Sequence, residues 1–111
     1  MNGYQITFFT HRDRRHNGRP LAEWLVHLAR EMDLHGATLI PAAEGFGHRR
    51  HLHGAHLFEA GDPPQEVQMA VTLDEAERLF ERLRDEDVNL FYVKMPVEFG
   101  KLEPDAGGSR P

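Results

Sequence analysis

The pattern of apolar residues along this 111-residue chain predicts an α+β sandwich. In four stretches the apolar residues alternate with other residues, as they do in strands, and in two stretches they recur every three or four positions, as they do in helices. The order is strand, helix, strand, long excursion, strand, helix, strand. This order contains two strand-helix-strand units, and with right-handed crossovers they predict a ferredoxin-like βαββαβ fold. In this fold both helices cover one face of a mainly antiparallel sheet, and here a long loop follows the second strand.

In each predicted strand, successive side chains alternate between the two faces of the sheet. The strands occupy residues 4–10, 37–43, 66–72 and 90–95. In the first strand Ile6 and Phe8 fall on one face, and Thr7 and Phe9 fall on the other. Pro41 lies within the second strand and predicts an edge position or a bulge, because proline cannot donate a hydrogen bond to a neighbouring strand.

The first helix follows a polar loop that contains the turn-forming pair Asn17 and Gly18. We expect the helix to extend from residue 21 to residue 34 and to be ended by Gly36 in the left-handed conformation that glycine favours. One face of this helix carries a continuous apolar stripe. Its residues are Leu21, Trp24, Leu25, Leu28 and Met32.

The second helix begins at a capping box. The Thr72 hydroxyl and the Glu75 carboxylate can each satisfy a free backbone amide at the helix start. The apolar stripe that follows comprises Ala76, Leu79, Phe80 and Leu83. After the last strand, residues 101–111 are rich in glycine and polar residues and predict a flexible tail, so residues 1–100 form the single predicted domain.

Composition narrows the classes of function. The net charge of −5 argues against a general nucleic-acid binder, which needs an excess of lysine and arginine. With no cysteine, the chain has no disulfides and no thiolate ligands or nucleophiles. The start of the chain lacks a signal-peptide pattern, and no apolar run is long enough to cross a membrane. We therefore expect a cytoplasmic protein without membrane insertion.

The face of the sheet that the helices leave open is expected to be apolar. Phe9, Leu90 and Tyr92 are the residues that we expect to contribute to it. Exposed apolar patches above a few hundred Å² rarely stay in water. A chain of this size also buries only about two-thirds of the surface that its unfolded form exposes. Packing of the sheets of several subunits would solve both problems.

The long excursion, residues 42–65, and the first loop contain the candidate site for a small anionic effector. Glycines let bare backbone amides approach an anion, and arginines donate forked hydrogen bonds to phosphate or carboxylate. The candidate residues are Gly45, Phe46, Gly47, Arg49, Arg50, Arg12 and Arg19, with Arg14 and Arg15 in the same first loop. The alternative is a loop hinge with a buried phenylalanine and ordinary surface arginines.

Four histidines in the excursion form a second candidate site, for a divalent metal. Zinc, copper and nickel all accept imidazole ligands. The four residues are His48, His51, His53 and His56. Their spacing matches no recognised zinc signature, so pairing with Glu44 or Glu59, or simple solvation, is the alternative. A histidine pH sensor is a third reading of the same residues.

Three short motifs resemble those of a known family. They are the glycine-arginine-proline-leucine entry to the first helix at residues 18–21, the entry to the second strand at residues 34–38, and the Gly45-Phe46-Gly47 turn. Together with the sequence between them, which extends over residues 4–99, they resemble the PII-like family labelled domain of unknown function 190.

The resemblance implies a trimeric, ferredoxin-like regulatory protein related to PII signalling proteins. Such proteins hold nucleotides or other small effectors in clefts between subunits, and their long loop after the second strand contacts partner proteins. No catalytic activity is implied, and neither a placed serine nor paired carboxylates suggest one. The expected partner is a membrane transporter or an enzyme, and the expected effector is an adenine nucleotide or another anion. A glycine-lysine nucleotide motif is missing. The alternative is a divalent-metal homeostasis protein of CutA-like architecture.

Overall fold

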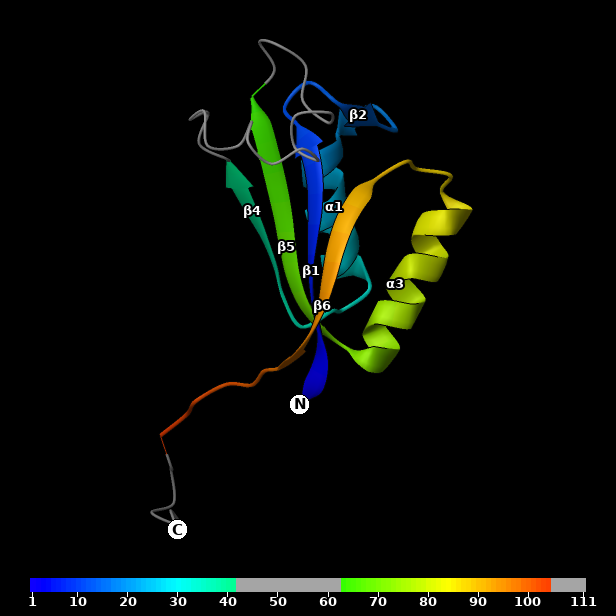
Figure 1. The fold of residues 1–111 in the computed structure, drawn as a ribbon. Helices are drawn as coiled ribbons and strands as arrows, with labels where there is room; N and C mark the ends of the chain where they lie inside the picture. Colours follow the sequence, from blue (N-terminus) through cyan, green and yellow to red (C-terminus); the bar gives the residue numbers. More distant parts are fainter. Residues whose placement is uncertain (42–62, 105–111) are drawn as a thin grey trace.

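The computed structural model of the chain describes residues 1–41 and 63–104 (Figure 1). Its main sheet is antiparallel throughout and has the strand order β4-β5-β1-β6. The strands are β1 (Asn2–His11), β4 (Ala37–Pro41), β5 (Pro64–Thr72) and β6 (Phe91–Glu98). The predicted ferredoxin-like fold is therefore confirmed, and β4, which contains Pro41, lies at an edge of the sheet as predicted.

The first loop contains a small hairpin that the sequence pattern did not predict as strands. β2 (Arg15–His16) pairs with β3 (Arg19–Pro20) around the turn residues Asn17 and Gly18. Both turn residues have positive φ angles, 53° and 79°, which two-residue hairpin turns require. The predicted turn thus becomes a hairpin that leads directly into the first helix.

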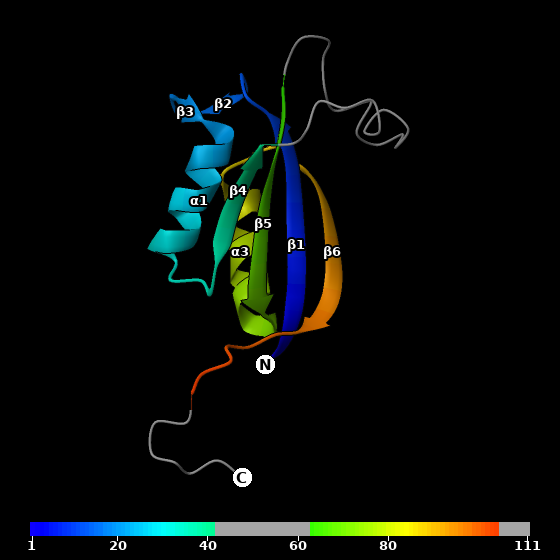
Figure 2. The same ribbon diagram turned by 90° about the vertical axis from the view of Figure 1, so that its left-hand side faces the viewer.

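Helices α1 (Leu21–Glu31) and α3 (Leu73–Asp85) both cover the same face of the sheet (Figures 1 and 2). α3 begins at the predicted capping box: the Glu75 amide donates to the Thr72 hydroxyl at 3.1 Å, and the Thr72 amide donates to the Glu75 carboxylate at 2.9 Å. The core between helices and sheet contains the predicted inward-facing residues of β1 and both helical stripes. Its most buried large side chains include Phe8, Ile6, Leu21, Leu25 and Leu79.

The end of α1 differs from the sequence prediction. The helix stops at Glu31, and Asp33, not Gly36, adopts the left-handed conformation, with φ of 58°. Two backbone hydrogen bonds close this end: the Leu34 amide donates to the Ala29 carbonyl at 2.9 Å, and the Asp33 amide donates to the Arg30 carbonyl at 3.0 Å. This pattern is a Schellman motif, and aspartate tolerates its left-handed position because its short side chain costs little there.

The open face of the sheet is apolar at β6, but its residues are not all those predicted. Tyr92 pairs with the inward-facing Phe8, so Tyr92 lies on the helical side, and Leu90 packs against the core. Alternation then places Phe91, Val93 and Met95 on the open face. Val93 and Met95 are 42% and 47% exposed. Phe9 lies on the open face as predicted, with its ring centroid 5.6 Å from that of Phe91.

Candidate functional site

The first loop meets the residue before β5 at one end of the sheet; the central segment that precedes Pro63, residues 42–62, lies outside the described residues. The Arg12 amide donates a 2.9 Å hydrogen bond to the carbonyl of Pro63, the residue just before β5. In the same place, His11 at the end of β1 pairs with Pro64 at the start of β5. The first loop is thus hydrogen-bonded to the residue at which β5 is entered.

Arg14 ties a third segment to this end of the sheet. Its guanidinium donates to the carbonyl of Asn89, which lies in the connection between α3 and β6. Its backbone carbonyl accepts from the Leu21 amide at 2.8 Å, so the same residue also holds the start of α1. Partial burial lowers the pKa of Arg14 from its ordinary value, although a guanidinium stays charged at neutral pH.

A second link between the first loop and the end of α3 is a hydrogen bond between His16 and Glu86. His16 Nε2 lies 3.0 Å from a carboxylate oxygen of Glu86, and Arg82 Nε donates to the other oxygen at 3.2 Å. The hydrogen bond to His16, followed by that to Arg82, lowers the pKa of Glu86 below its ordinary value. The His16 ring packs edge-on against Trp24, with centroids 4.3 Å apart. The β2–β3 hairpin is therefore held against both helices.

Of the predicted effector residues, Arg12 and Arg19 lie within the described part of the chain. Both are exposed and belong to the first loop, and neither has an ion-pair partner among residues 1–41 and 63–104. Arg19 lines a polar hollow of about 410 Å³ between the two helices, together with Arg82 and Glu86. Gly45, Phe46, Gly47, Arg49 and Arg50 lie outside the described residues, as do His48, His51, His53 and His56.

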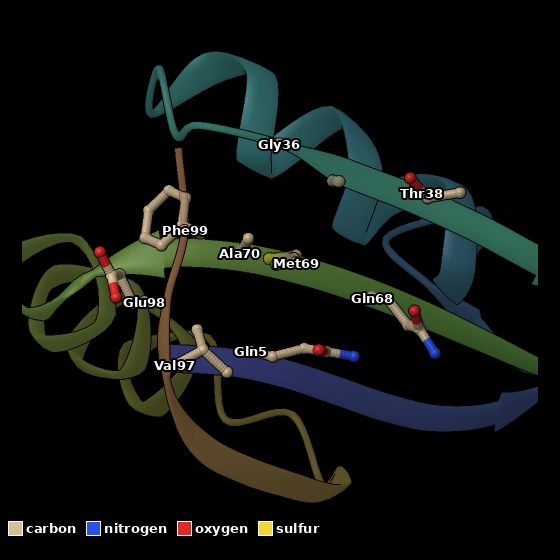
Figure 3. Close-up of a pocket in the computed structure, with 10 residues that line it drawn as sticks. Gln5, Gly36, Thr38, Gln68, Met69, Ala70, Val97, Glu98 and Phe99 are labelled. Carbon is tan, nitrogen blue, oxygen red and sulfur yellow. The ribbon is translucent and has the colours of Figure 1, made fainter. Parts of the chain in front are cut away.

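The open face of the sheet carries a shallow pocket of about 390 Å³ (Figure 3). Its polar lining consists of the amides of Gln5 and Gln68 and the hydroxyl of Thr38 on adjacent strands, together with the carboxylate of Glu98 at the end of β6. Phe99 closes one end of it, as Figure 3 shows. The only charged group that the described lining supplies is the Glu98 carboxylate, which repels anions, so this pocket does not suit a lone anion.

Comparison with known proteins places the chain in a family. Residues 3–97 match the model of domain of unknown function 190 (DUF190), described as "Uncharacterized ACR". The chain belongs to this DUF190 family. No curated protein matches it.

Two solved structures share the fold of this DUF190 chain. One is CPII from Thiomonas intermedia K12 bound to ADP, AMP and acetate, with 16% sequence identity, 90% of each chain covered and a TM-score of 0.61. The other is the apo form of CPII from the same organism, a nitrogen regulatory PII-like protein, with 13% identity, 87% of this chain and 92% of that chain covered, and a TM-score of 0.53. At these identities the likeness shows the PII-like fold.

Three features of this DUF190 chain's site were outside the sequence prediction. Arg14 was grouped with its neighbouring arginines, but the contact with Asn89 gives it a structural role that they lack. Glu86 carried no signal of its own in the sequence, because its partner His16 lies 70 positions away. For the open-face pocket, the sequence offered only the polar residues at positions of β4, β5 and β1 that face away from the helices.

Metal binding has no support within the described residues of the DUF190 chain, where no three potential ligands of the histidine, aspartate or glutamate type cluster. The four histidines proposed from the sequence are outside this part. No helix in residues 1–41 or 63–104 has the length and apolar character needed to cross a membrane.

Proposed function

We propose that this DUF190 protein is a non-catalytic, cytoplasmic regulator that binds a small anionic effector and controls a partner protein through its central segment. The effector is an adenine nucleotide or another anion that the first-loop arginines can hold. It binds in clefts between the subunits of a homotrimer. The partner is a membrane transporter or an enzyme.

The hydrogen bond between Arg12 and Pro63 is the observation that carries this proposal. It links a loop rich in arginine to Pro63, the residue that connects the central segment to β5. A ligand held by the loop would therefore change the position of this connection. A ligand changes a conformational equilibrium only if it binds one state more tightly than another. An anion held by both Arg12 and Arg19 would bind most tightly to the conformation in which their guanidinium groups are close together. Both side chains are available for this, because neither has an ion-pair partner in the described residues.

The choice of an adenine nucleotide is supported by the fold. CPII, which shares this fold, has a solved structure bound to ADP, AMP and acetate. The arginine guanidinium suits both phosphate and carboxylate because its forked donors match their oxygen atoms. The same two groups occur in the ligands of CPII, which is consistent with an anionic effector for this chain.

Association into a trimer is supported by the open face. An apolar strip lies on the side of the sheet that is not covered by either helix of the described residues; it comprises Phe9, Phe91, Val93 and Met95. Burial of apolar surface contributes roughly 25 cal/mol per Å². Packing of this strip against other copies would bury it and create clefts between subunits.

A thermal-shift panel on the full-length protein tests the proposal, because a ligand of the native state raises the melting temperature with its concentration. The ligands are ATP, ADP, AMP, bicarbonate, zinc and copper. We expect an adenine nucleotide or bicarbonate to raise the melting temperature, and the double variant Arg12→Ala, Arg19→Ala to lose that response. Arg30→Ala, an exposed arginine in the last turn of α1, is the matched control.

Two outcomes would contradict the proposal. One is a rise with zinc or copper alone, which favours the metal homeostasis alternative. The other is a nucleotide response that the double variant retains in full, which places the anion away from the first loop.

A further inference from the structure

A groove runs between helix α3 and the edge strand β6, which touch where Phe80 packs on Tyr92. The helix packs against β1 and β5, and its position beside β6 is visible in Figure 1. Two adjoining hollows of about 590 and 210 Å³ follow the groove and share Phe80, Arg84 and Tyr92. The larger has the size of a small-molecule pocket. The groove lies on the helical side of the sheet, so it is distinct from the open-face pocket.

The floor of the groove is aromatic. The Phe80 and Tyr92 ring centroids are 4.8 Å apart, and Phe8 lies 6.1 Å from Phe80 and 6.4 Å from Tyr92. Tyr92 is 44% exposed, which is unusual for a residue in contact with the core and leaves part of its ring free for a ligand. An incoming ring can therefore stack on aromatic surface that the fold has already ordered.

Two cations border the same floor without a carboxylate partner. Lys94 Nζ lies 4.5 Å from the Tyr4 ring centroid and 5.3 Å from that of Phe80, and Arg84 lines both hollows. Neither forms an ion pair with any residue in the described ranges, whereas Arg78 and Arg82 on the same helix both do. Within these ranges, neither positive charge is held in a direct ion pair.

Two carboxylates also line the larger hollow, but they lie towards the start of α3. Asp74 is paired with Arg78. Glu77 precedes Arg84 by seven residues, which is about 10 Å along a helix axis. The smaller hollow, next to Tyr92, has Arg84 as its only charged lining residue. The end of the groove at Arg84 and Tyr92 is therefore the end that favours an anion.

We propose that the groove between α3 and β6 binds a small aromatic anion, a planar ring that carries a phosphate or carboxylate group. The ring stacks on Tyr92 and Phe80, and the anionic group accepts hydrogen bonds from Arg84 and from Lys94, which leaves its place over the Tyr4 ring. This site goes beyond the effector site at the first loop and does not depend on it.

Calorimetric titration of the full-length protein with three probes tests the site. Phenyl phosphate carries both ring and anion, inorganic phosphate carries only the anion, and phenol carries only the ring. We expect phenyl phosphate to bind roughly tenfold more tightly than either of the others, since stacking and charge-assisted hydrogen bonds add. Equal affinities for phenyl phosphate and inorganic phosphate would overturn the proposal.

Variants and chemical-shift mapping locate the bound probe. Lys94→Gln and Tyr92→Ala should each weaken phenyl phosphate binding, and Lys101→Gln should not, because Lys101 is 82% exposed and pairs with Glu103 outside the groove. Amide shifts in the wild-type protein should centre on Phe80, Arg84 and Tyr92, which tests the site even if a variant folds poorly. Shifts centred on residues 12–20 instead would assign the probe to the first loop and refute the groove site.

Discussion

His35 Nδ1 lies 2.8 Å from one carboxylate oxygen of Glu75 and 3.0 Å from the other. This pair connects the segment before β4 to the start of α3, where the same carboxylate caps the helix through the Thr72 amide. Burial alone would raise the pKa of Glu75, but the hydrogen bonds from Thr72 and His35 and the charge of His35 outweigh it. The net effect is a pKa below the ordinary value of 4.5.

Replacement of this carboxylate should change how stability depends on pH. A lowered folded-state pKa means that the stabilisation is complete above the unfolded value of 4.5 and is lost as the pH falls through the lower folded value. We expect Glu75→Gln to reduce the free energy of unfolding at pH 7 by about 1–3 kcal/mol. The variant should also lack the further loss of stability that the wild type shows when Glu75 is protonated at acid pH. Urea unfolding between pH 7 and pH 3 measures both.

The control is Glu81→Gln, an exposed glutamate on the same helix, which should behave like the wild type. If the Glu75 and Glu81 variants lost the same stability at pH 7 and showed the same acid dependence, the pair of His35 and Glu75 would have no role in the fold.

Gly3 in β1 has no room for a side chain. A Cβ at this position would overlap the backbone carbonyl of Val71 on the neighbouring strand β5. We expect Gly3→Ala to reduce the free energy of unfolding by about 1–3 kcal/mol, because backbone of a central strand pair must move. Gly36→Ala, where a Cβ meets nothing within 4 Å, should change stability little. Urea unfolding of the two variants makes the comparison, and equal losses would mean that the strands separate freely at Gly3.

The link between His16 and Glu86 predicts a change in one pKa. Because the hydrogen bond from His16 is the largest cause of the low pKa of Glu86, His16→Ala should raise that pKa towards its ordinary value. Carbon-detected NMR titration of the Glu86 carboxyl measures it. His27→Ala is the control, since His27 lines the same hollow but has no bond to Glu86. An unmoved Glu86 pKa in His16→Ala would show that the hairpin is not held through this pair.

Local sequence chemistry predicted the elements that depend on local interactions. The capping box at Thr72 and Glu75 and the alternation of β1 both match the structure, because each is decided within a few residues. The predicted end of α1 was wrong because two nearby residues, Asp33 and Gly36, both tolerate a left-handed conformation. The backbone hydrogen bonds that close the last turn require this conformation at Asp33.

Features that depend on distant residues could not be predicted in the same way. Both faces of β6 carry large apolar side chains, so the side on which Tyr92 lies was settled only by its pairing with Phe8 in β1. The contact of Arg14 with Asn89 joins residues that are 75 positions apart in the sequence. The sequence selected the first-loop arginines as a group, and the fold distinguishes the one that holds the structure from Arg12 and Arg19, whose side chains remain exposed.

A charge on the open face should separate the subunits. Val93→Glu places a carboxylate in the apolar strip, and burial of an unpaired charge costs far more than the strip gains. We expect this variant to lose association while keeping its circular dichroism spectrum. The control is Leu73→Glu, which makes the same kind of change at a 56% exposed leucine on the first turn of α3. This variant should keep the wild-type mass. Loss of association in both variants alike would point away from the open face.

The mass of the wild-type protein in solution tests the central claim most directly, because the proposed clefts exist only if subunits associate through the open face. Multi-angle light scattering at micromolar concentration should give the mass of three chains of 12.7 kDa each. A single folded species with the mass of one chain would contradict the account, since the account places the effector in clefts between subunits.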